Sequence, residues 1–203
     1  MAKNRHSVVV DPAHGGRDKG VRLTKKFYEK DVTLAIAKLL KKELDRSKNI
    51  SVLLTRSADR DVSMSDRVKM AKRKNTKLFI SLHVNAGFGR SSSGFEVYFP
   101  GFKLPSTGKS ASKEIPKDMV KTKYLNESVR FAKIVEKNLE KIFRRKDRGL
   151  RSAPIPVLEG LTVPAVVLEI GFATNIKDRK KLMDKAVQKS IAGALAKSIR
   201  EFF

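Results

Sequence analysis

The chain has 203 residues, of which 45 are Lys or Arg and 21 are Asp or Glu, so its formal net charge at pH 7 is +24. Hydrophobic residues make up 40% of the chain, which is enough to build a core and argues against intrinsic disorder. The chain has no cysteine, and this excludes disulfide scaffolds, cysteine-ligated zinc, iron–sulfur clusters and a thiol nucleophile. A chain of this length predicts a single domain, residues 1–203.

The surplus of positive charge has two interpretations. So basic a chain favours a polyanionic partner, such as nucleic acid, an acidic membrane surface or an anionic cell-wall polymer. The alternative is a basic surface that only keeps the protein soluble. Lys and Arg are spread along the whole chain without a base-stacking or base-reading motif, so we expect no nucleic-acid partner.

Neither a membrane span nor a signal peptide is visible in the sequence. No stretch approaches the roughly 18–20 consecutive apolar residues that a spanning helix requires. Near the N-terminus only three valines precede Asp11 and Pro12, too few for a signal-peptide core. We therefore expect either a cytoplasmic protein or one from which a leader has been removed.

Short apolar strands alternate with amphipathic helices along the chain. Strands are predicted at residues 8–10, 51–55, 78–83, 95–99 and 163–170. Apolar positions at helical spacing predict helices over residues 31–44, with Asp31 as the N-cap, and over 64–71, 125–142 and 187–202. This alternation predicts an α/β domain with a mostly parallel sheet and helices on both faces.

Residues 100–125 break the pattern. They contain Pro100, Pro105 and Pro116, several Ser and Thr, and six lysines, with little periodicity. We predict a loop insertion here, and long loops inside compact domains tend to be functional lids or disordered segments.

Two of the three histidines follow predicted strands. His14 comes just after the first strand and His83 ends the third, so both are expected at the carboxyl edge of the sheet, where α/β proteins place their sites. Glu29, in the link before the first helix, is close enough in sequence to share that edge. Two imidazoles and a carboxylate suit a catalytic zinc ion with one position left for water. The alternative is that these are ordinary surface or core histidines.

Glu169 is the candidate general base. It ends the most hydrophobic strand, and burying a lone carboxylate there would cost several kcal/mol, so its side chain is expected to face a polar site. The alternative is a salt bridge to one of the many Lys or Arg residues. Glu159, in a predicted turn, and Glu96, in mid-strand, are weaker candidates.

Other catalytic motifs are missing from the sequence. The segment DPAHGGRDKG has neither the G-x-G-x-x-G spacing nor a P-loop Gly-Lys-Ser/Thr, which argues against nucleotide binding. No G-x-S-x-G motif is present, so a serine hydrolase of the usual kind is not expected.

Blocks in the same order along the chain resemble the zinc-dependent N-acetylmuramoyl-L-alanine amidases. The blocks are VVVDPAHGGRDKG, YEKDVTLAIAKLL, LTRSADRDVSMSDRVKMA, LFISLHVNA and VPAVVLEIGFATN. The resemblance covers the chain apart from residues 100–125. It implies a single-domain, six-stranded mixed sheet flanked by helices, and a zinc hydrolase that cleaves the amide between N-acetylmuramic acid and L-alanine in peptidoglycan.

The resemblance also implies roles for individual residues. His14, Glu29 and His83 would be the zinc ligands, and Glu169 the catalytic glutamate. Ala13 stands where the family usually has glycine, and alanine does not easily adopt φ > 0, so we expect an ordinary backbone conformation in this loop.

The insertion has a possible regulatory role by the same resemblance. In some amidases of the family an insertion near this place blocks the zinc site until an activator protein binds, and Glu114 is the carboxylate here that could reach the metal. We favour the alternative, a basic surface loop.

The resemblance further implies a periplasmic or extracellular protein, and we expect a monomer. Two rival functions stay open: a related zinc peptidase acting on another cell-wall amide, and a basic nucleic-acid-binding protein with incidental histidines. The first would yield a different product, and the second would bind no zinc tightly.

Overall fold

The computed structural model describes residues 5–87, 89, 91–101, 111–143 and 147–203, and gives only the backbone of 111–120, 147 and 148. The described residues form one sheet of six strands. The strands are β1 (His6–Pro12), β2 (Ile50–Leu54), β3 (Thr76–Asn85), β4 (Phe95–Pro100), β5 (Asp147–Ala153) and β6 (Ala165–Phe172).

The sheet is mixed but mostly parallel, as predicted. Its strand order is β2-β1-β3-β6-β4-β5, and only the β4–β6 pair is antiparallel. The carboxyl ends of β1, β2, β3 and β6 therefore meet at one edge of the sheet, which is where His14, His83 and Glu169 were expected.

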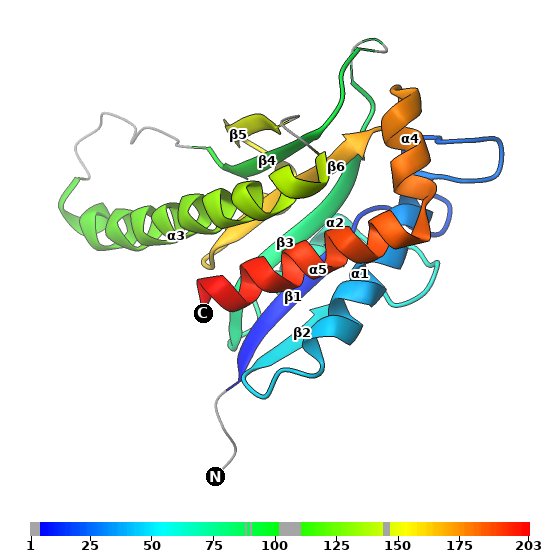
Figure 1. Ribbon diagram of the computed structural model, residues 1–203. Helices are drawn as coiled ribbons and strands as arrows, with labels where there is room; N and C mark the ends of the chain where they lie inside the picture. The colour runs from blue at the N-terminus through cyan, green and yellow to red at the C-terminus, as the bar shows by residue number, and fades with distance from the viewer. Residues whose placement is uncertain (1–4, 88, 90, 102–110, 144–146) are drawn as a thin grey trace.

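Helices cover the two faces of the sheet unequally. They are α1 (Glu29–Leu44), α2 (Met64–Ala71), α3 (Ala111–Phe143), α4 (Ile176–Met183), α5 (Lys185–Phe202) and the short 3-10 helix η1 (Pro156–Leu158). In Figure 1, α1, α3 and α5 lie across one face and α2 lies behind the sheet. The helix α2 packs with η1 on that second face, which is therefore more thinly covered.

Alternation along the strands divides the core into two layers. Val8 and Val10 pack in the large layer under α1, α3 and α5, whereas Val9 packs in the smaller layer with Ala71 of α2 and Val157 of η1. At the edge of the sheet where β1, β3 and β6 end and the antiparallel strand β4 begins, the alternation places polar side chains on the thinly covered face. These are Asp11, Ser81, His83, Glu96 and Glu169.

The start of the first helix differs from its prediction. Tyr28, not Asp31, is the N-cap, and Glu29 is the first residue of α1 rather than part of the link before it. Asp31 instead accepts a hydrogen bond from the Tyr28 backbone N–H at 2.9 Å, so its carboxylate caps from inside the first turn. The two acidic residues of this turn complement the positive end of the helix dipole.

The predicted loop at residues 100–125 is wrong for its second half. The helix α3 begins at Ala111 rather than near Leu125, while residues 102–110 lie outside the described residues. Residues 111–125 contain Lys, Glu, Met and Leu, which are good helix formers. The prolines and serines of residues 100–125 favoured the prediction of a loop instead.

Three described elements, β5, α4 and the 3-10 helix η1, have no counterpart among the predicted strands and helices. The strand β5 has the sequence DRGLRSA and pairs only with β4, so it is an edge strand without the apolar alternation of a buried one. The helix α4 has eight residues and is too short for a clear periodic pattern. Within the described part of the chain, no helix combines the length and apolar character that crossing a membrane would require.

Candidate metal site

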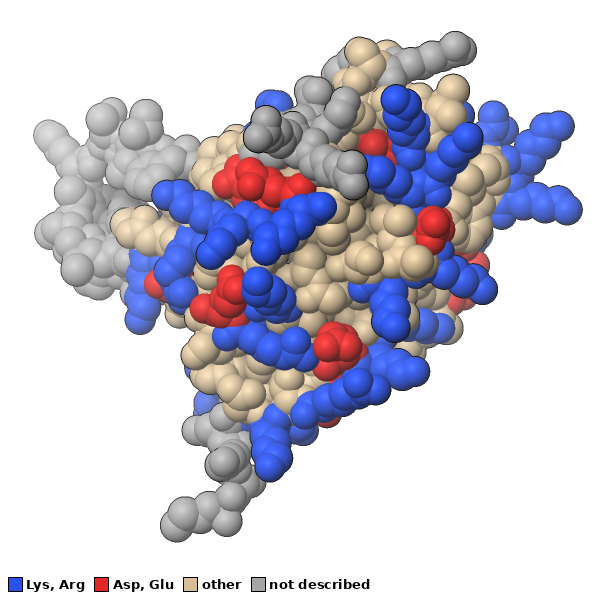
Figure 2. All heavy atoms as spheres, in the orientation of Figure 1, with Lys and Arg blue, Asp and Glu red and all other residues tan. Residues whose placement is uncertain are grey.

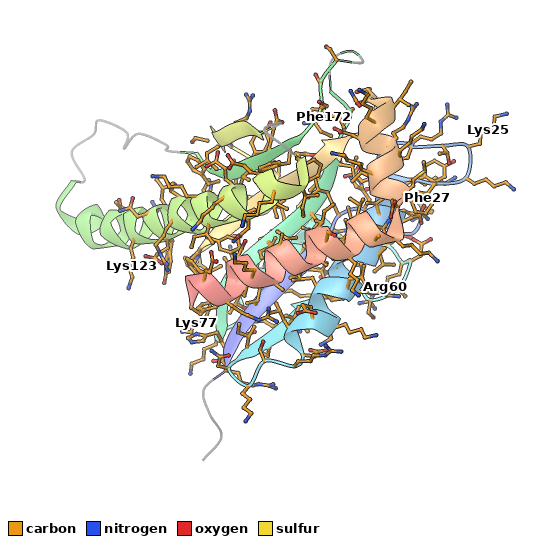
Figure 3. All side chains as sticks on the ribbon, viewed as in Figure 1. Lys25, Phe27, Arg60, Lys77, Lys123 and Phe172 are labelled. Carbon is orange, nitrogen blue, oxygen red and sulfur yellow. The ribbon has the colours of Figure 1, made fainter. Side chains whose placement is uncertain are left out.

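His14, Glu29 and His83 come together at the carboxyl edge of the sheet, as the sequence predicted. His14 lies two residues beyond β1, Glu29 opens α1, and His83 lies near the end of β3. In Figure 3 the labelled residues Phe172, Phe27 and Lys25 mark this end of the fold. Lys77 and Lys123 lie toward the other end.

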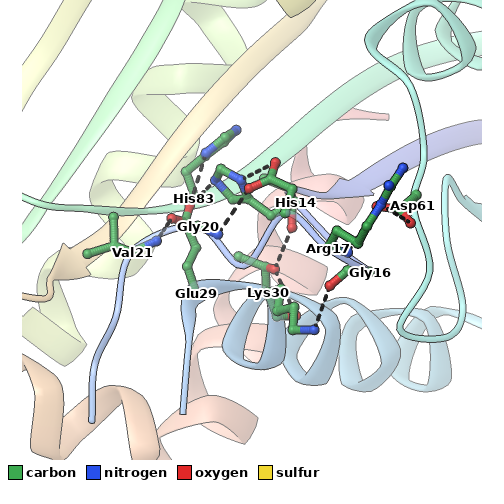
Figure 4. Close-up of polar contacts among 12 residues, drawn as sticks. His14, Gly16, Arg17, Gly20, Val21, Glu29, Lys30, Asp61 and His83 are labelled. Carbon is green, nitrogen blue, oxygen red and sulfur yellow. Dashed lines mark hydrogen bonds and ion pairs between the residues drawn. The ribbon is translucent and has the colours of Figure 1, made fainter. Parts of the chain in front are cut away.

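Both imidazoles point at the same carboxylate oxygen (Figure 4). His14 Nε2 and His83 Nδ1 each lie 3.1 Å from Glu29 Oε1. The Glu29 side chain is 1% exposed, whereas those of His14 and His83 are 24% and 26% exposed. The cluster therefore has a buried carboxylate and two imidazoles that solvent can reach.

Backbone groups fix the Glu29 carboxylate. Its Oε1 accepts the Val84 N–H at 2.9 Å, and its Oε2 accepts the Val21 N–H at 2.9 Å. Gly20 lies directly against the cluster, where a Cβ would come within 2.6 Å of both Glu29 Oε2 and His14 Cδ2. This position therefore requires glycine.

The donor set fits a zinc ion. The three side chains each offer a ligand atom, all within 4.8 Å of one another. Ligands at about 2.0–2.1 Å from a tetrahedral zinc lie roughly 3.3 Å apart, close to the 3.1 Å from each imidazole to Glu29. Two nitrogens and one oxygen also leave a fourth position for water or substrate.

The charges of the cluster shift its pKa values in opposite directions. Burial lowers the pKa of His14, but hydrogen bonds and charge interactions with Glu29 and Asp18 outweigh burial and raise it to about 9. Burial raises the pKa of Glu29, but the two histidines lower it to about 2. A metal cation bound here would have to displace the proton that His14 holds.

A second carboxylate orients His14. Asp18 Oδ2 lies 2.8 Å from His14 Nδ1, the ring nitrogen facing away from Glu29, and Asp18 Oδ1 accepts the Gly20 N–H at 3.1 Å. Metal-ligating histidines commonly have such a partner on their other nitrogen. Asp18 was not predicted from the sequence as a site residue, although its spacing of four residues from His14 was a usable signal.

The loop around His14 is partly as predicted. Ala13 has no positive φ, as expected for alanine, but His14 itself lies in the left-handed region with φ 61°. The prediction of an ordinary backbone was therefore wrong one residue further on. Arg56 and Arg67 donate hydrogen bonds to the Ala13 and His14 carbonyls, and these contacts stabilise the left-handed conformation of His14.

Glu169 lies beside the cluster on the neighbouring strand. It pairs in register with His83 across β3 and β6, and its Oε2 is buried without a hydrogen-bond partner among the described residues. Burial is the main cause that raises its pKa to about 7, with further contributions from the charges of Glu29 and Glu96 against those of the histidines. A carboxyl group with this pKa can take up and release a proton near neutral pH.

The other candidate carboxylates occupy different places. Glu96 pairs in register with Glu169 but is engaged by Asn85, Tyr98 and Arg151. Glu159 is exposed in the turn that follows η1.

Glu114 is not brought to the cluster by its helix. Ser128, in the middle of α3, accepts the backbone N–H of Ala165 at the start of β6, the opposite edge of the sheet. Glu114 lies 14 residues earlier, about 20 Å further along the helix. Its side chain is outside the described residues.

The chain is similar in sequence to known amidases. The family model for N-acetylmuramoyl-L-alanine amidase matches residues 8–201. The amidase CwlM of Bacillus licheniformis is 32% identical over 97% of this chain and 68% of its own length. The amidase AmiC of Escherichia coli O6:H1 is 27% identical over 97% of this chain, which spans only 52% of that protein.

The fold is also similar to that of solved amidase structures. The catalytic domain of CwlV, an N-acetylmuramoyl-L-alanine amidase from Bacillus (Paenibacillus) polymyxa var. colistinus, superimposes with a TM-score of 0.79. The two chains are 31% identical, and the match covers 97% of each. This chain belongs to the N-acetylmuramoyl-L-alanine amidase family.

Proposed function

We propose that the protein is a zinc-dependent hydrolase that cleaves the amide bond between N-acetylmuramic acid and L-alanine in peptidoglycan. The observation that carries the proposal is the convergence of His14, Glu29 and His83 beside the buried Oε2 of Glu169, which has no hydrogen-bond partner among the described residues. Family membership supports the choice of bond. The chain spans about half of the AmiC relative, so activity and substrate are assigned to this domain alone.

His14 Nε2, Glu29 Oε1 and His83 Nδ1 would hold the zinc ion. When bound, zinc supplies a Lewis acid that activates a water molecule and polarises the scissile carbonyl. Asp18 keeps His14 turned toward the ion, and the Val21 and Val84 N–H groups keep the Glu29 carboxylate in place.

Glu169 moves the proton in this mechanism. Its Oε2 takes a proton from the attacking water as the oxygen bonds to the carbonyl carbon of the lactyl group. It then donates that proton to the nitrogen of L-alanine as the carbon–nitrogen bond breaks, which leaves a carboxylic acid on muramic acid and a free amine on the peptide. The acid then loses its proton to the amine or to solvent and becomes a carboxylate. The pKa of about 7 suits both steps.

The positive charge assists binding to the wall in this proposal. Figure 2 shows Lys and Arg spread over the visible face, with fewer acidic groups between them. Stem-peptide carboxylates and anionic wall polymers would attract such a surface. The proposal places the protein in the periplasm or outside the cell, where peptidoglycan lies.

Mass spectrometry of the products from isolated peptidoglycan tests the assigned bond. We expect free stem peptides that begin with L-alanine, lost when a chelator is added and restored by zinc. Peptides cut at another bond would instead support the rival zinc peptidase. No release by the zinc-loaded protein would overturn the proposal.

A matched pair of variants ties the product to the site. Glu169→Gln should release stem peptides at a rate lowered about 10²–10⁴-fold while still binding zinc, because it removes only the proton acceptor. Glu140→Gln makes the same change on the exposed side of α3 and should release peptides at the wild-type rate. Tight zinc binding also separates this function from the rival nucleic-acid-binding protein.

A further inference from the structure

Two arginines lie buried behind the His14 loop. Arg56, just after β2, has no exposed surface and is the largest fully buried side chain among the described residues. Arg67, on α2, is 6% exposed. Burying a guanidinium group is costly unless its donors are satisfied, so the contacts that these two groups make show what they stabilise.

The two guanidinium groups hold three successive backbone carbonyls. Arg56 donates from Nε to the Pro12 oxygen at 2.9 Å and from Nη2 to the Ala13 oxygen at 2.9 Å. Arg67 donates from Nη1 to the Pro12 oxygen at 3.1 Å and from Nη2 to the His14 oxygen at 2.8 Å. Every carbonyl from the end of β1 to the histidine itself is thus fixed by an arginine.

Arg67 is in turn anchored to the strands of the site. It forms a buried ion pair with Asp11, whose carboxylate also accepts hydrogen bonds from Thr55 at 2.5 Å and from Ser81 at 2.8 Å. Ser81 precedes His83 by two residues on β3, so their side chains are on the same face of the sheet. One continuous set of contacts therefore runs from the His14 carbonyl to the strand that carries His83.

This arrangement holds His14 in a conformation that it would otherwise leave. A left-handed backbone is unfavourable for a non-glycine residue, because its Cβ comes too close to the following carbonyl oxygen. Arg56 also passes directly beneath the next residue, where a Cβ on Gly15 would approach the Arg56 Cδ to 2.9 Å. Without the arginines, the loop could relax toward ordinary backbone angles and turn the His14 ring away from Glu29.

We propose that Arg56 and Arg67 are positioning residues of the metal site, which act by holding His14 in its ligating conformation. The inference rests on the proposed function because it takes His14, Glu29 and His83 as zinc ligands. Neither arginine is a ligand: each acts through the backbone of the His14 loop.

Substituting Arg67 by lysine separates positioning from plain stabilisation. Lysine keeps a charge beside Asp11 but cannot reproduce the fork that spans Asp11, Pro12 and His14. The matched control is Arg130→Lys on α3, where the arginine donates to the Phe202 carbonyl at 3.2 Å and contacts the Phe202 ring. Both variants are compared with the wild type in the full chain, by thermal unfolding of the metal-free protein and by metal binding.

Two readouts report on the ligands themselves. The zinc dissociation constant is measured by competition with a chromophoric chelator, and the absorption spectrum of the cobalt(II)-substituted protein reports coordination. We expect Arg67→Lys to raise the dissociation constant about 10–100-fold and to change the cobalt spectrum. Arg130→Lys should alter only the unfolding temperature.

The outcomes are distinct. Zinc affinity within twofold of the wild type and an unchanged cobalt spectrum in folded Arg67→Lys would overturn the inference while leaving the metal site intact. A wild-type protein that binds no zinc would overturn the proposed function, and the inference with it. If Arg67→Lys does not fold, Arg56→Lys, which leaves the Arg67–Asp11 ion pair in place, decides by the same two readouts.

Discussion

His83 and Glu169 are direct register partners on the parallel strands β3 and β6. This pairing fixes the separation of a candidate metal ligand from the candidate proton carrier through two neighbouring backbones rather than through a flexible loop. Sites built on strands hold their geometry more closely than sites built on loops. The two side chains should therefore be separable by mutation, one affecting metal binding and the other turnover.

Glu169→Gln should lower kcat by about 10²–10⁴-fold, because the amide keeps the shape of the side chain but cannot accept the proton. Its zinc content, measured by elemental analysis, should stay at one ion per chain. His83→Ala should instead lose the zinc. A Glu169→Gln protein with a normal turnover rate would contradict the assigned role.

Zinc binding should strengthen as the pH rises from 6 to 8. His14 has a pKa of about 9 in the metal-free protein and must release its proton to bind the ion, so the apparent affinity should rise up to tenfold per pH unit. Titration calorimetry in buffers of different ionisation enthalpy would count the protons released. An affinity that does not change over this range would contradict the assignment of His14 as a ligand.

The stability of the metal-free protein should fall as the pH rises, whereas its zinc affinity should increase. Because its pKa lies above the ordinary value of 6.5, the stabilisation from its pairing with Glu29 and Asp18 is fully present below pH 6.5. It is lost as the pH rises through 9. Chemical unfolding of the chelator-treated protein should therefore show a fall in stability between pH 7 and 10, and His14→Gln should remove this contribution.

Gly20→Ala should weaken metal binding. The new Cβ would lie 2.6 Å from both Glu29 Oε2 and His14 Cδ2, and φ is +62°, so the substitution combines steric overlap with backbone strain. Gly149→Ala is the control, because Gly149 has φ +87° and nothing within 4 Å of the added Cβ. Both variants should lose some stability, but only the first should lose zinc affinity. Equal zinc affinity in the two proteins would show that the close approach at Gly20 is unimportant.

Binding to isolated sacculi should weaken with added salt. A net charge of +24 attracts an anionic wall mainly through exposed side chains, and these interactions are screened over about 8–10 Å at 0.1–0.15 M salt. Co-sedimentation with the Glu169→Gln protein measures binding without digestion of the wall. Binding that is unaffected between low and high salt would leave solubility as the role of the charge.

The sequence predicted the site better than its surroundings, and the reason is physical. His14, His83 and Glu169 follow or end short apolar runs, so their convergence follows from the parallel sheet alone. The edge strand β5 is half polar and carries no comparable pattern. Glu29 was placed near the site, but its position inside α1 depends on a tyrosine N-cap, which propensities disfavour.

The residues that hold the His14 loop in place could not be predicted from the sequence, for a different reason. The contacts of Arg56 and Arg67 with the His14 loop join residues 43 to 55 positions apart, and no local pattern encodes them. The left-handed conformation of His14 was hidden in the same way, because it is stabilised by these contacts from distant residues.

The strand order has a consequence for the order in which the site forms. In the sheet β2-β1-β3-β6-β4-β5, β6 is the bridge between two groups of strands that do not otherwise pair. During synthesis, the chain carries His14, Glu29 and His83 well before Glu169 emerges, and Glu169 arrives on the strand that joins the two groups. A nascent or truncated chain would therefore carry the three candidate ligands without the candidate proton carrier, and the proposed hydrolysis would require closure of the whole sheet.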